Sequence, residues 1–216
     1  MLTDLHSHEK TYSPDSFQSL DEMTRTAAER GLDGICITDH DTQELAGHIG
    51  WQTRMNGVRV FVGCEVFTLE GDILVFGAPV LPKERVDIVT LSEIVRAQNG
   101  VMIAAHPYRH NLRGLAENLF RYGHLLDGIE AYNGSTFPDD NERARKAAQQ
   151  LGITMTGAGD SHHIGAIGRF ATHFTGIIET VTDLVEAIKT GACSPALPGP
   201  GGYDTLYPVV PRRREA

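Results

Sequence analysis

The feature that most constrains this chain is a repeated alternation of short apolar runs with segments of helical periodicity. The apolar runs have the length of buried strands. They cover residues 1–5, 32–38, 58–64, 101–105, 128–131 and 153–158. Strands that alternate with helices are typical of parallel βα units. Because no linker or internal repeat interrupts the series, we expect a single α/β domain built as a barrel.

Capping boxes predict where two of the helices begin. Ser19 with Glu22 starts a helix that ends at Gly31, and Thr90 with Glu93 starts another. The other expected elements are helices at 43–55, 115–122, 139–151 and 181–190, a hairpin at 67–76 that turns at residues 70–72, and a strand at 170–175.

The length and composition suit one globular domain. A chain of 216 residues can fill one core, and we expect the domain at residues 1–193, followed by a Pro- and Gly-rich extension at 194–216. The formal net charge of −9 argues against an extended nucleic-acid-binding face, which needs a basic surface. Metal ions or a few arginines can still create a local site for an anion.

The cysteines and the N-terminal sequence indicate the compartment. Cys36, Cys64 and Cys193 form no CxxC pair and are typical of reduced core residues. The opening MLTDLHSH lacks the regions of a signal peptide, and no apolar run approaches the ~18 residues of a membrane span. We therefore expect a cytoplasmic protein that crosses no membrane. The oligomeric state stays open.

Histidines and carboxylates stand where the expected strands end. In βα barrels, functional side chains lie on the loops that follow the carboxyl ends of the strands. The candidates, in chain order, are His6, His8, Asp15, His40, Glu65, His106, Asp160 and His162. Their placement predicts one cluster at one end of the barrel.

These residue types suit divalent metal ions. Residues at i and i+2 of a strand point the same way, so His6 and His8 can address one ion. Imidazole and carboxylate together favour Zn, Mn or Fe, and a carboxylate such as Glu65 can bridge two ions. Each piece alone has a plainer explanation, such as a chance HxH pair, a histidine satisfied within a turn, or a carboxylate that caps one. The joint pattern favours a metal site.

The ordered motifs HSH, TDHD, GCE, AAHP and GDSH resemble those of the PHP family, named for polymerase and histidinol phosphatase domains. The resemblance runs from about residue 2 to about residue 175. It implies a distorted (β/α)7 TIM-like barrel that holds two or three divalent metal ions and hydrolyses phosphate esters.

The resemblance also implies a set of ligands for each ion. The sets are His6, His8, Glu65 and Asp160 for a first ion, Glu65 and His106 for a second, and Asp15, His40 and His162 for a third. The family commonly adds a histidine to the second ion, but the corresponding stretch here reads GIEAYNG. Glu130 and Asn133 could each ligate weakly or instead contact the substrate. Glu130 could also orient one of the histidines.

Several residues are candidates for contacts with the substrate. Arg109 lies three residues after the histidine of AAHP, and a guanidinium forks onto phosphate oxygens. A solvated loop arginine is the plainer alternative. Asn133, Arg143 and Arg169 are further substrate-binding candidates, although Arg143 lies in a helix whose charged face could simply be solvated. His163 is a candidate general acid for the leaving group.

The expected activity is hydrolysis of a small phosphorylated metabolite, such as a nucleotide or a sugar phosphate, by a metal-bridged hydroxide. Two alternatives remain: a metal-dependent hydrolase of amide or cyclic ester bonds, and a catalytically silent PHP module. Arginines near the expected metals favour a phosphate ester, and the intact ligand set argues against a silent module. A phosphate-release screen separates the three.

Overall fold

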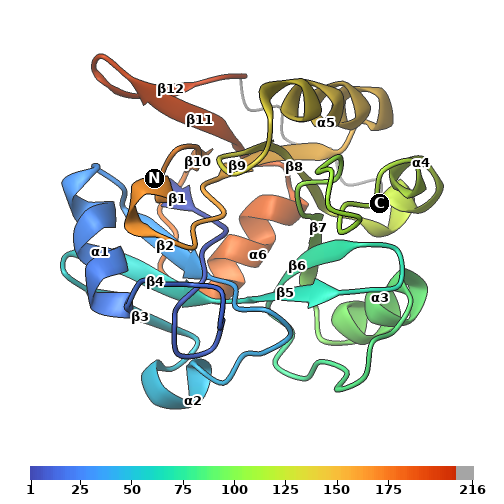
Figure 1. The fold of residues 1–216 in the computed structure, drawn as a ribbon, viewed down its shortest axis with the longest axis horizontal. Helices are drawn as coiled ribbons and strands as arrows, with labels where there is room; N and C mark the ends of the chain where they lie inside the picture. The colour runs from blue at the N-terminus through green and yellow to red at the C-terminus, as the bar shows by residue number, and fades with distance from the viewer. Residues whose placement is uncertain (208–216) are drawn as a thin grey trace.

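The strands form two sheets in the computed structural model, which describes residues 1–207 (Figure 1). The first sheet has the order β12-β11-β10-β1-β2-β4-β3. Its strands are β1 (Leu2–Asp4), β2 (Gly34–Ile37), β3 (Gln52–Met55), β4 (Val58–Val62), β10 (Ala171–Phe174), β11 (Cys193–Gly199) and β12 (Gly202–Thr205). The pairs β1–β2 and β2–β4 are parallel, and the other neighbours are antiparallel.

The second sheet has the order β5-β6-β7-β8-β9. Its strands are β5 (Cys64–Phe67), β6 (Asp72–Phe76), β7 (Val101–Ala104), β8 (Gly128–Asn133) and β9 (Thr154–Ala158). The pairs β7–β8 and β8–β9 are parallel, whereas β5–β6 and β6–β7 are antiparallel. The expected hairpin at 67–76 is therefore present as β5 and β6.

The two sheets meet where the candidate ligands lie. Single parallel bridges join Ser7 to Ser161 and His40 to Glu65, and β9 also lies against β10 and β11. The expected mixed α/β fold is confirmed. The strands of residues 1–207, however, pair as two sheets and not as one closed (β/α)7 barrel. The antiparallel pairs account for the difference, since a series of parallel βα units contains none.

Helices pack on the faces of both sheets, and one of them also contributes to the apolar cluster between the sheets. They are α1 (Leu20–Glu29), α2 (Ala46–Ile49), α3 (Ile88–Ala97), α4 (Asn118–Tyr122), α5 (Pro138–Leu151) and α6 (Val181–Lys189), with single turns η1 (Gly123–Leu125) and η2 (Ile164–Ala166). An apolar cluster between the sheets includes Phe61, Phe76 and Leu184 of α6. Separate clusters pack α3, α4 and α5 on the second sheet and α1 on β2 and β4. None of the described helices is long and apolar enough to span a membrane.

Local signals explain how the helices begin. Ser19 and Glu22 form the expected capping box at the start of α1. The box expected at Thr90 is wrong, because α3 begins earlier. There the carboxylate of Asp87 accepts hydrogen bonds from the backbone N–H groups of Val89 and Thr90, and aspartate is among the strongest N-caps.

The helix expected at 43–55 is wrong for most of its length. Only α2 is helical, and β3 then pairs antiparallel with β4. The turn between them is Asn56-Gly57, with φ of 48° and 87°. Positive φ at both positions is the mark of a type I′ hairpin turn, which Asn-Gly favours. A helical interpretation of this stretch overlooks that dipeptide.

The Pro- and Gly-rich segment enters the first sheet. β11 pairs antiparallel with β10, and β12 pairs with β11. The predicted boundary after residue 193 therefore falls inside β11, and the division into domain and extension stays a prediction. Residues 208–216 of that segment lie outside the described residues.

Asp4 ties the end of β1 to the segment that follows β9. Its carboxylate is fully buried and accepts hydrogen bonds from the backbone N–H groups of His6 (3.2 Å), Gly159 (2.8 Å) and Gly168 (2.8 Å). A Cβ at Gly159 would lie 2.6 Å from Oδ2 of Asp4, so this close approach requires glycine. One side chain thus positions two segments that carry candidate ligands.

We expect Asp4→Ala to lower the free energy of unfolding by roughly 3 kcal/mol or more. Three buried N–H groups would lose their acceptor, and each unsatisfied group costs about 1–3 kcal/mol. Asp33→Ala is the matched control, because Asp33 is exposed and accepts one bond, from the N–H of Leu2 at 2.8 Å. Urea unfolding followed by circular dichroism measures both variants. Equal losses would contradict the anchoring role of Asp4.

Candidate metal centre

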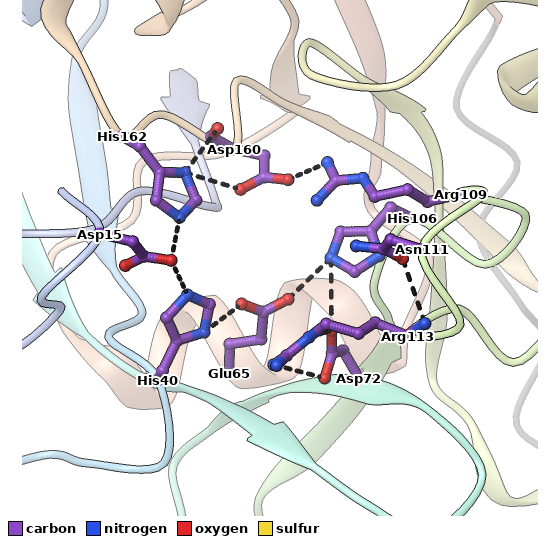
Figure 2. Close-up of a pocket in the computed structure, with 10 residues that line it drawn as sticks. All are labelled: Asp15, His40, Glu65, Asp72, His106, Arg109, Asn111, Arg113, Asp160 and His162. Atoms are coloured by element: carbon purple, nitrogen blue, oxygen red, sulfur yellow. Dashed lines mark hydrogen bonds and ion pairs between the residues drawn. The ribbon is translucent and has the colours of Figure 1, made fainter.

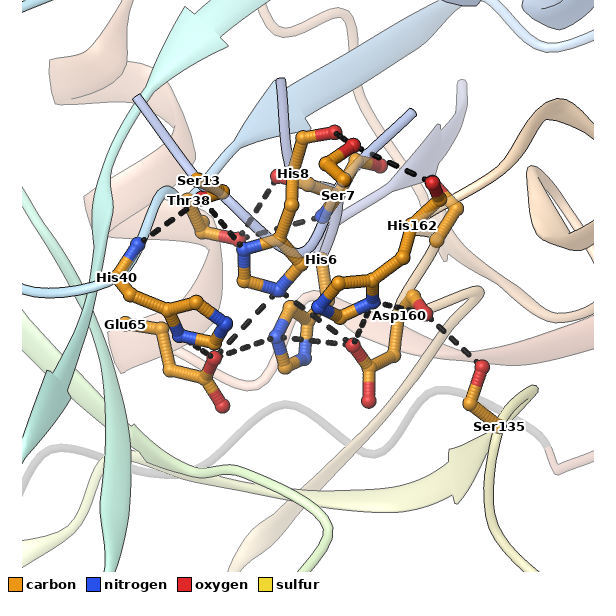
Figure 3. A network of polar contacts seen from close by, with 12 residues as sticks. His6, Ser7, His8, Ser13, Thr38, His40, Glu65, Ser135, Asp160 and His162 are labelled. Carbon is orange, nitrogen blue, oxygen red and sulfur yellow. Dashed lines mark hydrogen bonds and ion pairs between the residues drawn. The ribbon is translucent and has the colours of Figure 1, made fainter. Parts of the chain in front are cut away.

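All eight expected ligand side chains come together where the two sheets meet (Figure 2, Figure 3). Their positions are His6 and His8 after β1, Asp15 in the loop that follows, His40 after β2, Glu65 within β5, His106 after β7, and Asp160 and His162 after β9. Single bridges join the segment after β1 to the segment after β9, and the segment after β2 to Glu65 of β5, which brings these side chains together.

Two nitrogens and two oxygens of this cluster lie as far apart as neighbouring ligands of one metal ion. Nε2 of His6 lies 3.4 Å from Oε2 of Glu65 and 3.5 Å from Oδ1 of Asp160. Nε2 of His8 lies 3.5 Å from each of the same two oxygens. Two ligands of one tetrahedral ion, with metal–ligand bonds of about 2.0–2.1 Å, are roughly 3.3–3.4 Å apart. These four N···O distances therefore suit ligands of one ion, and His6, His8 and Asp160 form one of the candidate ligand groups.

Three of these four atoms are also without hydrogen bonds. Nε2 of His6, Nε2 of His8 and Oδ1 of Asp160 are buried and have no hydrogen-bond partner among the described residues. Buried polar atoms are rarely left unpaired in folded proteins. One divalent ion would satisfy all three, and Zn, Mn and Fe bind imidazole nitrogen and carboxylate oxygen. The residues thus fit the metal that the motifs imply.

Two further groups of potential ligand atoms adjoin this site. Oε1 of Glu65 lies 2.8 Å from Nε2 of His106. Oδ2 of Asp15 lies 3.2 Å from Nε2 of His40 and 3.4 Å from Nε2 of His162. Glu65 faces the first site through Oε2 and the second through Oε1, as a bridging carboxylate does.

The backbone is strained at two of the candidate ligands. φ is 27° at His106 and 49° at Asp160, and side chains other than glycine rarely adopt such values. Conformations of this kind cost on the order of 1–3 kcal/mol and occur mainly at functional sites, where the surroundings hold them.

Glu130 holds two of the histidines in place. Its Oε1 lies 3.1 Å from Nδ1 of His6, and its Oε2 accepts the backbone N–H of His106 at 2.7 Å. The first contact leaves Nε2 of His6 available to bind an ion, since a metal-bound histidine usually pairs through its other ring nitrogen. Glu130 belongs to none of the ligand groups found in residues 1–207. Of the roles left open by the sequence, the geometry favours the orientation of a histidine.

Asn133 is the buried centre of a polar network. Its Nδ2 donates to Oε2 of Glu130 (2.9 Å) and to Oδ2 of Asp160 (3.1 Å), and its Oδ1 accepts from Nη2 of Arg109 (2.8 Å). A register shift in β8 between Glu130 and Tyr132 lets residues three apart face the same side of the strand. Asn133 does not line the cavity described next, so the geometry makes it a support for Arg109 and does not favour a substrate contact.

A cavity of about 110 Å³ opens onto the cluster. Its lining residues are Asp15, His40, Glu65, Asp72, His106, Arg109, Asn111, Arg113, Asp160 and His162. Arg109 and Arg113 both enter it from the loop after β7 (Figure 2). Sequence reasoning found Arg109 but missed Arg113, Asn111 and Asp72. The available signal was a second arginine four residues further along the same loop.

Three sequence candidates lie elsewhere. His163 is exposed, and Arg169 is exposed and donates to a backbone carbonyl at 3.1 Å. Arg143 lies on α5, where it pairs with Asp140 at 3.4 Å and covers the ring of Tyr108 at 4.3 Å. None of the three lines this cavity, so the structure does not support their expected roles. Helix or loop placement alone gave no information on which way these side chains point.

The charges of the cluster favour a bound cation. Burial alone would lower the pKa of His6, but Asp160, Glu65 and Glu130 raise that pKa well above its usual value. Burial would raise the pKa values of Glu65 and Asp160, yet His6 and its neighbours hold both well below the usual range. Burial lowers the pKa of His8 to about 4, so this ring is uncharged at neutral pH and able to bind metal. The carboxylates that attract a proton to His6 would equally attract a divalent ion.

A mixed α/β fold that gathers buried histidines and carboxylates beside a cavity defines a candidate metallohydrolase.

Residues 138–193 match a family model described as PHP-associated. The uncharacterized protein MJ1587 of Methanocaldococcus jannaschii is 32% identical over 144 residues, 62% of this chain and 82% of that protein. A protein of Caldicellulosiruptor bescii named "Probable phosphatase" is 26% identical over 207 residues, 78% of this chain and 84% of its own length. The chain belongs to the PHP family.

Solved structures share the fold at low sequence identity. PsfC from Pseudomonas syringae superimposes with a TM-score of 0.75 at 17% identity, over 91% of both chains. A two-domain protein from Bacteroides vulgatus, described as containing a "predicted PHP-like metal-dependent phosphoesterase", gives 0.65 at 18% identity, over 91% of this chain and 64% of that one. Endonuclease Q in complex with a duplex DNA gives 0.66 at 19% identity, over 95% of this chain and 59% of that one. These likenesses establish the fold alone.

We expect Glu130→Ala to weaken metal binding by about 10–100-fold, because the variant loses the group that orients His6. Affinity for Mn²⁺ or Zn²⁺ is measured by competition with a chromogenic chelator. Glu93→Ala on the exposed face of α3 is the control and should bind like the wild type. If Glu130→Ala also binds like the wild type, the contact with His6 plays no part in holding the metal.

Proposed function

We propose that this protein is a metal-dependent phosphoesterase that removes phosphate from a small phosphorylated metabolite of the nucleotide or sugar phosphate type. Membership of the PHP family makes it a hydrolase of phosphate esters. The observation that carries the proposal is the distance of 3.4 to 3.5 Å from Nε2 of His6 and of His8 to one oxygen each of Glu65 and Asp160. Such a site, beside a cavity with two arginines, suits hydrolysis of a phosphate ester.

Two or three divalent ions, of Mn, Zn or Fe, are proposed. His6, His8, Glu65 and Asp160 would hold the first, Glu65 and His106 the second, and Asp15, His40 and His162 the third. Bound there, the ions would supply an activated water and a positive charge facing the phosphate oxygens. Because Glu65 faces two of the sites, it would set the spacing between neighbouring ions.

The protein itself would position the phosphate group and donate hydrogen bonds to it through Arg109. Arg109 is fixed by Asn133 and Asp160 through Nη2 and by Thr136 through Nε. Its Nη1 makes no hydrogen bond to the described part of the chain, and the side chain lines the cavity. A guanidinium held this way would bind a phosphate oxygen without rearranging, which is the main demand of phosphoryl transfer.

A small substrate is favoured over nucleic acid and over an amide. The cavity of about 110 Å³ accommodates a phosphate-sized group, and the net charge of −9 repels an extended polyanion. Two guanidinium groups in the lining match a phosphate better than a neutral amide. Endonuclease Q, whose fold is similar, was solved with a DNA duplex, so an abasic duplex belongs in the substrate screen.

The test is phosphate release from a panel of nucleotide and sugar phosphates. We expect activity with added Mn²⁺, its loss on treatment with a chelator, and its recovery when the ion is restored. Glu65→Gln should lower kcat at least about 100-fold, because it removes the carboxylate that two sites share. Exposed Glu93→Gln is the control. Activity that persists after complete removal of metal would refute the proposal. Strand cleavage of an abasic duplex, followed on a denaturing gel, with no phosphate released from any member of the panel would also refute it.

A further inference from the structure

We infer that Arg113 is a second anion-binding group of this cavity and that it directs the site toward phosphate monoesters over diesters. The inference rests on the proposed function and names the substrate class more closely. Arg113 lines the cavity together with Arg109, and the two side chains enter it from the same loop (Figure 2).

The guanidinium of Arg113 is fixed by a buried carboxylate. Nε donates to Oδ2 of Asp72 at 2.7 Å, and Nη2 donates to Oδ1 at 2.9 Å. The side chain of Asp72 is only 1% exposed, whereas that of Arg113 is 32% exposed. The guanidinium also lies over the ring of Phe67, 4.3 Å from its centroid. A two-pronged bond and a stacked ring restrict this arginine to one orientation.

The backbone holds the same residue to β6. The N–H of Asp72 donates to the carbonyl of Arg113 at 2.7 Å. A Cβ at Gly71 would lie 2.8 Å from that carbonyl oxygen, and one at Gly114 would lie 2.4 Å from the carbonyl oxygen of Pro107. Both approaches require glycine. These close backbone contacts fix the position of Arg113. A solvated surface arginine would not require them.

The two arginines each pair with a buried aspartate and leave the same nitrogen unused. Asp72 binds Arg113 through both Nε and Nη2, whereas Asp160 binds Arg109 through Nη2 alone. In each guanidinium, Nη1 makes no hydrogen bond to residues 1–207, although it carries two N–H donors. Each arginine therefore brings unused donors to a cavity that is lined mainly by candidate metal ligands.

The unused N–H donors of Arg109 and Arg113 would favour a phosphate monoester over a diester. A phosphate monoester has three terminal oxygens and a charge of about −1.5 to −2 near neutral pH, whereas a diester has two terminal oxygens and one negative charge. When ions on His106 and Glu65 bind part of the phosphate, a monoester still has a terminal oxygen for Arg113. A diester has an esterified oxygen at that place, which a guanidinium binds poorly.

The experiment compares p-nitrophenyl phosphate with bis(p-nitrophenyl) phosphate on the metal-loaded protein. We expect the wild type to prefer the monoester. Arg113→Ala should lower kcat/KM for the monoester about tenfold or more and change that for the diester less than about twofold. The inhibition constant of inorganic phosphate should rise about tenfold. Arg113→Lys, which keeps the charge but not the two-pronged bond, should lie between the wild type and Arg113→Ala.

Arg85→Ala is the matched control. Arg85 stacks on Phe67 at 3.6 Å and donates to the carbonyl of Thr68, but it does not line the cavity. It should leave both esters unchanged. Equal losses with the two esters, no loss in Arg113→Ala, or a wild-type preference for the diester would overturn the inference.

Failure of the proposed function gives a different result. If the wild type hydrolyses neither ester, the proposed function fails, and calorimetric binding of inorganic phosphate to the metal-loaded protein then decides the role of Arg113. Binding that weakens about tenfold in Arg113→Ala and is unchanged in Arg85→Ala would support an anion site. Unchanged binding in Arg113→Ala would overturn it.

Discussion

The arrangement of this protein depends on the burial of Glu65 and Asp160 beside the rings of His6 and His8. Buried carboxylates are costly unless positive charge or hydrogen-bond donors compensate them. Here each of the two imidazoles lies 3.4 to 3.5 Å from both carboxylates, which is too far for hydrogen bonds of good geometry but suits ligands of a shared ion. A divalent cation would neutralise the carboxylates and would also satisfy the unpaired atoms. The four side chains lie together because the two sheets meet at this point.

Buried polar side chains around the cluster also hold the segments that carry the candidate ligands close together. Asp4 fixes the end of β1 to the segment after β9, and Glu130 fixes His6 and the backbone of His106. Asn133 links Glu130 to Arg109. Positions far apart in the chain are thereby held close together, which is how a site with strained backbone at two ligands remains ordered.

Strand-end positions could be predicted from the sequence, whereas side-chain direction could not. An apolar run directly precedes or includes each of three ligands, His6, Glu65 and His106. That local pattern was enough to predict that they belong to one cluster. Arg113 does not directly follow an apolar run, and its orientation depends on a hydrogen bond to Asp72, which lies 41 residues away in the chain. The hairpin of β5 and β6 was predicted from its turn residues, but the antiparallel pairing of β6 with β7 was not. Apolar runs do not encode direction, so β6 and β7 could not be distinguished from parallel βα units.

Anomalous diffraction from crystals grown with Mn²⁺ would locate the bound ions themselves. We expect a peak at the Mn absorption edge among His6, His8, Glu65 and Asp160, with at least one neighbouring peak on the other side of Glu65. Data collected on a Glu65→Ala crystal should lose both peaks. Ions bound elsewhere on the protein, with none in the cluster, would show that these residues form no metal site.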